Sequence, residues 1–205
     1  MKPNGRDTMT RASALSAVAG AALLLSGCIS LTPKPPKSLL SLSPASGGVA
    51  AGTERRGAVN AALTILVPTV PQKLRTQRVP VTTAGTDIAY VKDVQWVEAP
   101  ARLFQRLLSE TVAARGGRLV LDESQYVAGP GELLAGQLMD FGVDADRMEA
   151  VVTYEAQRLT NAGANVVQRR FEARVPISAV EPVGVGRALN DAANRVAADV
   201  ASWVG

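Results

Sequence analysis

The chain contains few side chains that suit catalysis, because its 205 residues include no histidine. Serine–histidine and cysteine–histidine mechanisms are therefore excluded, as is any histidine-ligated metal site. Cys28 is the only thiol, so the chain cannot form an internal disulfide or a zinc site of several cysteines. General acid–base catalysis would rest on carboxylates, lysine or tyrosine. No carboxylate pair stands in a recognisable motif, so we predict a binding protein with no catalytic residues and no metal site.

Cys28 follows a segment with the character of a secretion signal. The first residues carry positive charge on Lys2, Arg6 and Arg11. Residues 12–26 carry no charge, and these fifteen residues are fewer than the roughly 20 that a membrane-spanning helix needs. We predict that residues 1–27 form a signal peptide, with translation starting at Met1 or Met9. The alternative, a buried core helix, conflicts with the basic flank and the N-terminal position.

The motif Leu25-Ser26-Gly27-Cys28 resembles the lipobox of bacterial lipoproteins. That resemblance implies that the Cys28 thiol carries diacylglycerol, that the signal is cut before Cys28, and that the new amino group is acylated. These acyl chains are the only added group we expect, and two or more chains anchor a protein stably. The alternative is a structural cysteine, but the lack of any other thiol favours lipidation. The next residue is Ile29 and not aspartate, which by resemblance to sorting signals favours the outer membrane.

Residues 28–38 are predicted to be a lipidated cysteine and a proline-rich tether, and residues 39–205 a single domain. The prolines of the segment 32–37 favour a stiff polyproline II conformation. Loss of the signal peptide removes three basic residues and Asp7, so the net charge falls from +4 to +2. Such a weak charge on a periplasm-facing protein argues against a nucleic-acid partner.

Hydrophobic periodicity predicts two amphipathic helices, over residues 100–115 and 184–204. Proline in the first turn and two glycines after the end mark the first of them. The remaining apolar runs predict strands at residues 39–43, 63–67, 78–83, 86–91, 118–122, 132–141, 148–159 and 166–177. Alternation in the last two strands predicts a sheet with one solvated face. We expect an α/β fold of the α+β type, with a mostly antiparallel sheet packed against both helices.

The order of these features resembles one family. The resemblance rests on the lipobox, the proline-rich tether, a Leu-Ser-Leu-Ser-Pro strand, and Trp96 and Glu98 before a helix that contains Phe104. On these features the chain resembles the ABC-type transport auxiliary lipoproteins, the PqiC/YmbA-like group. The resemblance implies an outer-membrane lipid anchor. It also implies an MCE-type phospholipid transporter as partner, made of an ABC permease, an ATPase and an MCE protein. The lipoprotein would dock the MCE protein at the outer membrane, as a homo-oligomeric ring in some members.

Two sets of residues are candidates for a functional role in the folded domain. Lys73, Arg75 and Arg78 form a basic loop, which either faces a partner or is ordinarily solvated. Trp96 is amphipathic and precedes a helix, so we predict a structural anchor in preference to a ligand contact.

Charged residues near the C-terminal strands allow two further interpretations. Asp144, Asp146 and Glu149 carry oxygens that suit Ca²⁺, but they lack the pattern of a calcium loop, and a hairpin turn at residues 142–146 is favoured. Three arginines in the last strand either bind lipid phosphates or pair with Glu155 or Glu172 on a solvated face: Arg169, Arg170 and Arg174.

Together these features predict an outer-membrane lipoprotein that faces the periplasm and assists an MCE-type lipid transporter. The first alternative is an outer-membrane assembly or structural lipoprotein unrelated to lipid transport. The second is a carboxylate-based periplasmic hydrolase, which no motif supports.

Overall fold

The computed structural model describes residues 35–45, 47–116, 118–125, 131–160 and 163–205. The described residues from Pro36 onward belong to one folded unit. The predicted signal peptide, Cys28 and Ile29 lie outside the described residues. None of the helices in these ranges is long and apolar enough to cross a membrane.

Strand β7 (Glu132–Asp144) runs through the middle of the main sheet. On one side it pairs antiparallel with β8 (Glu149–Thr160), which pairs antiparallel with β9 (Asn165–Pro176). These three strands match the predicted ones, although β7 continues to Asp144 and the connecting turn moves to residues 145–148. Met148 has a positive φ of 52°, so it belongs to the turn and does not begin the strand as expected.

The other side of β7 is occupied by two short parallel strands. Strand β2 (Leu63–Ile65) pairs with the first residues of β7, and β3 (Pro80–Thr83) pairs with its last residues. Between these two pairings, Thr69 forms an isolated parallel bridge with Gln137 of β7. The chain from β2 to β3 therefore runs parallel to β7, and a loop between Thr69 and β3 interrupts the pairing. That loop contains the 3-10 helix η2 (Gln72–Leu74).

The remaining strands extend the sheet at its edges and form a second, two-stranded sheet. Strand β4 (Asp87–Tyr90) makes the predicted antiparallel hairpin with β3, and β6 (Val120–Asp122) pairs parallel with β2. Strands β1 (Ser38–Leu40) and β5 (Val94–Trp96) pair parallel to each other. The α+β class is therefore confirmed, but the sheet is mixed, and the expectation of a mostly antiparallel sheet is only partly right.

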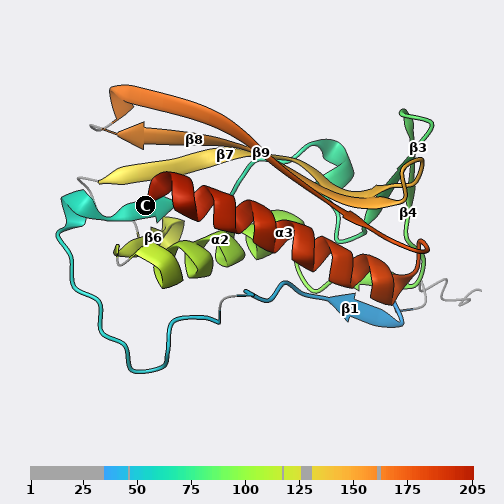
Figure 1. Ribbon diagram of the computed structural model, residues 1–205, viewed down its shortest axis with the longest axis horizontal. Coiled ribbons are helices and arrows are strands. Elements are labelled where there is room, and N and C mark those ends of the chain that lie inside the picture. The colour runs from blue at the N-terminus through green and yellow to red at the C-terminus, as the bar shows by residue number, and fades with distance from the viewer. Residues whose placement is uncertain (1–34, 46, 117, 126–130, 161–162) are drawn as a thin grey trace, which may run out of the picture. The chain divides into compact units, whose positions relative to one another are not determined.

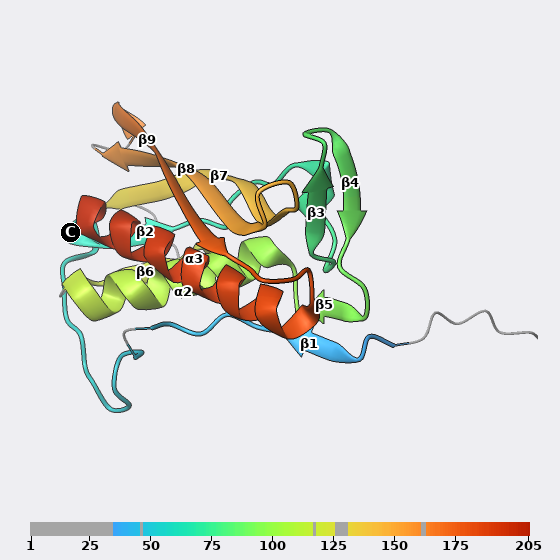
Figure 2. The same cartoon turned by 45° about the vertical axis from the view of Figure 1, so that its right-hand side comes forward.

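Helices α2 (Pro100–Gly116) and α3 (Pro182–Val204) pack against one another and cover one face of the main sheet (Figures 1 and 2). Both begin with proline in the first turn, where the missing N–H costs no helical hydrogen bond. The buried stripe of α3 repeats at helical spacing: Val185, Ala188, Leu189, Ala192, Ala193, Val196, Ala197, Val200, Ala201 and Val204. Small alanines on this stripe let the helix lie close to its neighbours.

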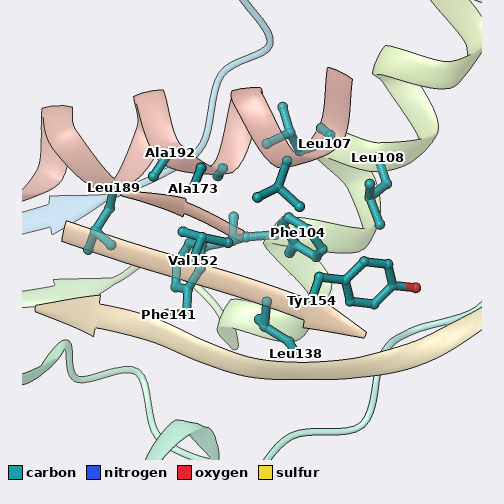
Figure 3. Close-up of a cluster of buried hydrophobic side chains, with 14 of the residues drawn as sticks. Phe104, Leu107, Leu108, Leu138, Phe141, Val152, Tyr154, Ala173, Leu189 and Ala192 are labelled. Carbon is teal, nitrogen blue, oxygen red and sulfur yellow. The ribbon is translucent and has the colours of Figure 1, made fainter. Parts of the chain in front are cut away.

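The centre of the core is aromatic (Figure 3). Phe104 of α2 lies edge-on to Tyr154 of β8, with ring centroids 5.2 Å apart, and Phe141 lies 6.4 Å from Phe104. The Tyr154 hydroxyl donates to the Ala135 carbonyl oxygen at 3.0 Å, so its buried polar atom is satisfied. Burial raises the pKa of Tyr154 well above its ordinary value. A Cβ at Gly136 would lie 2.7 Å from this ring, so only glycine leaves room for it.

The face of the sheet opposite the helices was expected to be solvated, but part of it is buried. Val151 and Thr153 of β8 are buried on it, because the long side chains of β9 extend over them. The start of β9 shows the opposite departure: residues 165–170 are exposed on both faces, including Val167, which was expected to face the core. Phe171 contacts Trp203 near the last turn of α3, and the strand residues that precede Phe171 are exposed.

Candidate functional site

The first described residues are attached to the loop before β5. The backbone N–H groups of Lys37 and Ser38 both donate to the Asp93 carbonyl oxygen, at 3.1 and 3.2 Å. The Lys37 ammonium lies 2.9 Å from the Asp93 carboxylate in an exposed ion pair. These contacts fix the start of β1 to the loop that precedes β5.

Helix α3 holds the segment that follows β1. The Asn190 side-chain oxygen accepts from the Ser43 N–H at 2.9 Å, and the Asn194 oxygen accepts from the Ala45 N–H at 2.7 Å. The Asn194 amide also donates to the Ser43 carbonyl oxygen at 2.9 Å. In an amphipathic helix these two asparagines count only as polar residues. In the structure they bind the N-terminal segment, a contact that helical spacing alone does not reveal.

The basic loop separates into an inward and an outward part. The Lys73 ammonium lies 3.0 Å from Asp140 of β7, and this ion pair is partly buried. The Arg78 guanidinium lies over the Tyr90 ring, 4.2 Å from its centroid, a favourable cation–π distance. Arg75 is exposed and has no ion-pair partner among the described residues. The structure therefore presents Arg75 and Arg78 to solvent, while Lys73 is held against the sheet.

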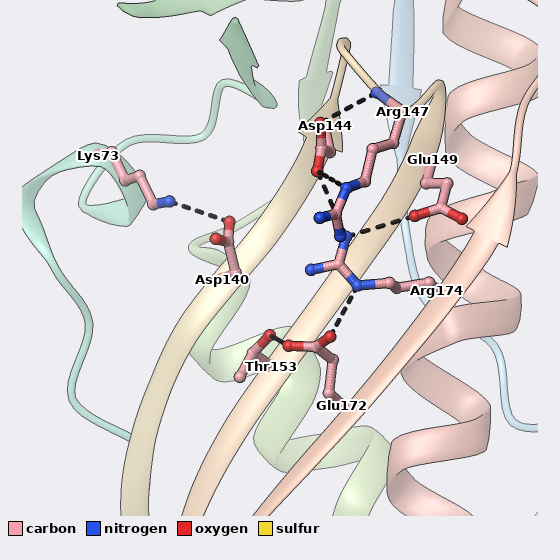
Figure 4. Close-up of polar contacts among 8 residues, drawn as sticks. All are labelled: Lys73, Asp140, Asp144, Arg147, Glu149, Thr153, Glu172 and Arg174. Carbon is pink, nitrogen blue, oxygen red and sulfur yellow. Dashed lines mark hydrogen bonds and ion pairs between the residues drawn. The ribbon is translucent and has the colours of Figure 1, made fainter. Parts of the chain in front are cut away.

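A charged network crosses the open face of β7, β8 and β9 (Figure 4). Arg174 of β9 is its centre, with nitrogens 2.7 Å from Glu172 and 3.3 Å from both Asp144 and Glu149. The hydrogen bond from Arg174 holds the pKa of Glu172 below its ordinary value. The Thr153 hydroxyl donates to the same carboxylate at 2.9 Å. Arg174 thus neutralises acidic side chains from three strands.

The three arginines of β9 do not form one free basic patch. Besides Arg174, Arg170 lies 2.7 Å from the Glu155 carboxylate, directly opposite it in the β8–β9 register. Arg169 lies over the Phe171 ring, 5.0 Å from its centroid. The arrangement agrees with a paired strand face and leaves no cluster of guanidinium groups for a lipid phosphate.

The acidic residues considered for Ca²⁺ are arranged around arginine. Asp144 and Glu149 share Arg174, and Asp144 also accepts from the Arg147 backbone N–H at 3.2 Å. Within the part of the chain that the structure describes, no three acidic side chains are grouped as a metal site would require.

The basic loop and the charged network share a cleft of about 420 Å³. Lys73 and Asp140 line one side, and Arg147 and Arg174 line another. The length of β7 brings these groups together, because the strand carries Asp140 and then continues past its predicted end at residue 141 to Asp144. The cleft is polar and contains opposite charges in balance, so it suits a charged protein surface better than a small anion.

Trp96 ends β5 and faces the core. It is 1% exposed, and its ring centroid lies 5.0 Å from that of Phe141. The indole nitrogen is buried and has no hydrogen-bond partner among the residues that the structure describes. Trp96 therefore links the two-stranded sheet to the main sheet by ring packing.

Glu132, which the sequence did not single out, holds two arginines at the other end of the domain. Arg158 donates to both carboxylate oxygens, at 2.8 and 2.9 Å, and Arg118 donates at 3.2 Å. The same guanidinium groups donate to the carbonyl oxygens of Trp203 and Val204 at the end of α3. Cations at a helix C-terminus stabilise the helix, because they lie next to the partial negative charge of its dipole. The Arg158 hydrogen bonds hold the pKa of Glu132 below its ordinary value.

Comparison with protein families identifies the chain. The family model described as ABC-type transport auxiliary lipoprotein component matches residues 40–201, and the chain belongs to this family. Its role is therefore associated with ABC-type transport, and the family consists of lipoproteins. No curated protein matches the chain.

Solved structures share the fold at low sequence identity. Protein XCC0632 from Xanthomonas campestris, of the DUF330 family, is 16% identical with a TM-score of 0.63, over 82% of this chain and 92% of that one. An uncharacterised protein is 14% identical with a TM-score of 0.62, over 74% of this chain and 97% of that one. The PelC dodecamer from Paraburkholderia phytofirmans is a looser match, at 15% identity and a TM-score of 0.41 over 74% and 93%.

Proposed function

We propose that this protein is an outer-membrane lipoprotein, facing the periplasm, that docks the MCE component of a phospholipid transporter at the outer membrane. Acyl chains on Cys28 anchor it, and Ile29 permits its sorting to the outer membrane. The observation that carries this proposal is the family match over residues 40–201, downstream of the lipobox. The protein binds and positions its partner and does not catalyse.

The N-terminal contacts support an anchoring role. A tether is useful only if it is attached to the folded domain, and Asp93, Asn190 and Asn194 provide that attachment. Between Cys28 and Lys37 there are nine peptide steps, which reach at most about 30 Å when fully extended. The lipid would therefore confine the domain to the membrane surface, where the effective concentration for a membrane-bound partner is high.

The basic loop is the proposed contact with the MCE protein. Arg75 and Arg78 are exposed, and Lys73 of the same loop lines the 420 Å³ cleft. Exposed arginines with no buried partner retain their full capacity to pair with acidic side chains of another protein. An assembly lipoprotein unrelated to lipid transport remains the alternative, and it would have the same anchor but different partners.

The test is purification of the acylated full-length protein from membranes, followed by identification of its partners. We expect the MCE protein to co-purify, with the permease and ATPase bound through it. Combined Arg75→Glu and Arg78→Glu should weaken its recovery, whereas Arg102→Glu on α2 is a matched change of an exposed arginine elsewhere and should not. Recovery of assembly factors without an MCE protein would support the alternative.

A further inference from the structure

The end of the domain where the chain enters exposes several apolar side chains. Strand β1, strand β5, the β3–β4 hairpin and the first turns of α3 all lie at this end (Figures 1 and 2). The large exposed aliphatic residues here are Leu39 on β1, Ile88 on β4, Val97 directly after β5, Val180 just before α3 and Val183 in its first turn. Leu39 is 61% exposed and Val183 is 64% exposed, although neither side chain can hydrogen-bond with water.

Leu39 and Val97 point away from the core for a definite reason. In the parallel register Leu40 lies opposite Trp96, and both turn inward, with the Leu40 side chain against Gly186 of α3. Since side chains alternate along a strand, Leu39 turns outward, and so does Val97 beyond the end of β5. The outer face of this small sheet therefore carries Leu39 and Val97, with Gln95 opposite Leu39 in the register.

An apolar cleft of about 430 Å³ continues the same surface. It is open between the hairpin and the start of α3, and its walls include Ala89, Val91, Val180 and Pro182. Asp93 also lines it, and Asp93 is the residue that holds Lys37. The apolar side chains thus surround the point where the tether joins the domain.

Basic groups accompany these apolar ones. Lys92 and Arg187 are exposed at this end, with Glu181 and Asp93 as acidic neighbours, and Asp93 is paired with Lys37. Aliphatic side chains beside lysine and arginine are the composition of protein surfaces that enter the interfacial region of a bilayer, where the cations meet anionic headgroups.

We infer that this end of the domain lies against the lipid bilayer, with Leu39, Val97, Val180 and Val183 in the headgroup region. The inference rests on the proposed anchoring through Cys28. The short tether joins the domain among these residues, so the bilayer is the apolar phase nearest to them. They are spread over β1, the residue after β5 and the start of α3, and a soft planar surface accommodates such spread better than the single groove of a protein partner.

Photocrosslinking in vesicles tests the inference. The acylated full-length protein is placed in vesicles of phosphatidylethanolamine with a minor share of phosphatidylglycerol, with a benzophenone side chain in place of Leu39, Val183 or Val166. Val166 is the matched control, because it is 57% exposed but lies near the start of β9. We expect several-fold more lipid adducts at Leu39 and Val183 than at Val166. Equal yields would overturn the inference.

Charge substitution gives a second readout without the anchor. For the full-length mature chain carrying Cys28→Ser, we expect combined Leu39→Glu and Val183→Glu to weaken sedimentation with the same vesicles by about tenfold. Combined Val166→Glu and Val167→Glu should leave it unchanged. Equal effects of the two pairs would overturn the inference, as would benzophenone adducts in whole envelopes that join Leu39 or Val183 to a protein and not to lipid.

Mass spectrometry of Cys28 separates this inference from the proposed function. Acylated protein with equal adduct yields overturns only the membrane face. An unmodified Cys28 overturns the anchoring, and with it the inference that depends on it.

Discussion

The side-chain amide of Asn194 donates to the backbone carbonyl oxygen of Ser43 at 2.9 Å, across 151 positions of sequence. The same amide group accepts from the Ala45 N–H, so one side chain on α3 satisfies two backbone groups of the N-terminal segment. This contact joins the segment next to the tether with the last helix of the domain.

Asn194→Ala should lower the free energy of unfolding by about 1–2 kcal/mol, because two hydrogen bonds to the segment are lost. Asn194→Asp should also lower stability, because it keeps the acceptor for the Ala45 N–H but puts a carboxylate oxygen against the Ser43 and Asn190 carbonyl oxygens. Asp191→Ala changes an exposed residue on the same helix and is the control. Urea titration of the three variants measures the differences, and equal midpoints for Asn194→Ala and the control would contradict the contact.

Acidification should destabilise the domain through Glu132 and Glu172. Arg158 and Arg174 hold the pKa values of these carboxyls below the ordinary value of 4.5. Because the folded-state pKa is lowered, the stabilisation is complete above pH 4.5 and is lost as the pH falls through the lowered values.

Glu132→Gln isolates the larger arginine contact. It should cost about 2 kcal/mol near neutral pH, because Arg158 and Arg118 lose their charged acceptor. The variant should also lose less stability than the wild type between pH 5 and pH 3, which equilibrium unfolding at several pH values measures. An unchanged acid dependence in the variant would show that other carboxyls control it.

Local sequence patterns predicted the helices and the long hairpins, but they did not predict contacts between segments far apart in the sequence. The proline and glycine signals located α2, and alternation located β8. The parallel pairing of β2 and β3 with β7 was not predicted, because the loop around η2 separates the two short strands. The sequence of each short strand does not indicate which strand it pairs with. Asn194 was missed for the same reason: a polar residue on a helix has the same pattern whether it meets water or another segment.

Trp96 tests the proposal of a structural anchor. Trp96→Ala should cost about 3–5 kcal/mol, because it leaves a cavity next to Phe141. Trp96→Phe should cost much less, since the indole nitrogen makes no hydrogen bond to the described residues that could be lost. Thermal unfolding compares the two, and a ligand-contact role would instead predict lost partner binding in Trp96→Phe at unchanged stability.

Ile29 tests the proposed sorting to the outer membrane. Ile29→Asp introduces the residue associated with retention at the inner membrane, so the acylated protein should move to the inner-membrane fraction on a density gradient. Ile29→Ser is the control and should stay with the outer membrane. If the aspartate variant also stays there, the proposed signal does not operate on this protein.

The central claim is that the protein acts as an anchored docking component, and release from the membrane tests it most directly. The measurement is restoration of the envelope barrier in a deletion strain by a secreted form with a cleavable signal and Cys28→Ser, at the cellular level of the wild type. Because release dilutes the domain into the whole periplasm, we predict that this form folds but fails to restore the barrier, whereas the acylated wild type succeeds. A diffusible catalyst loses little on release, so full restoration by the secreted form would contradict the account.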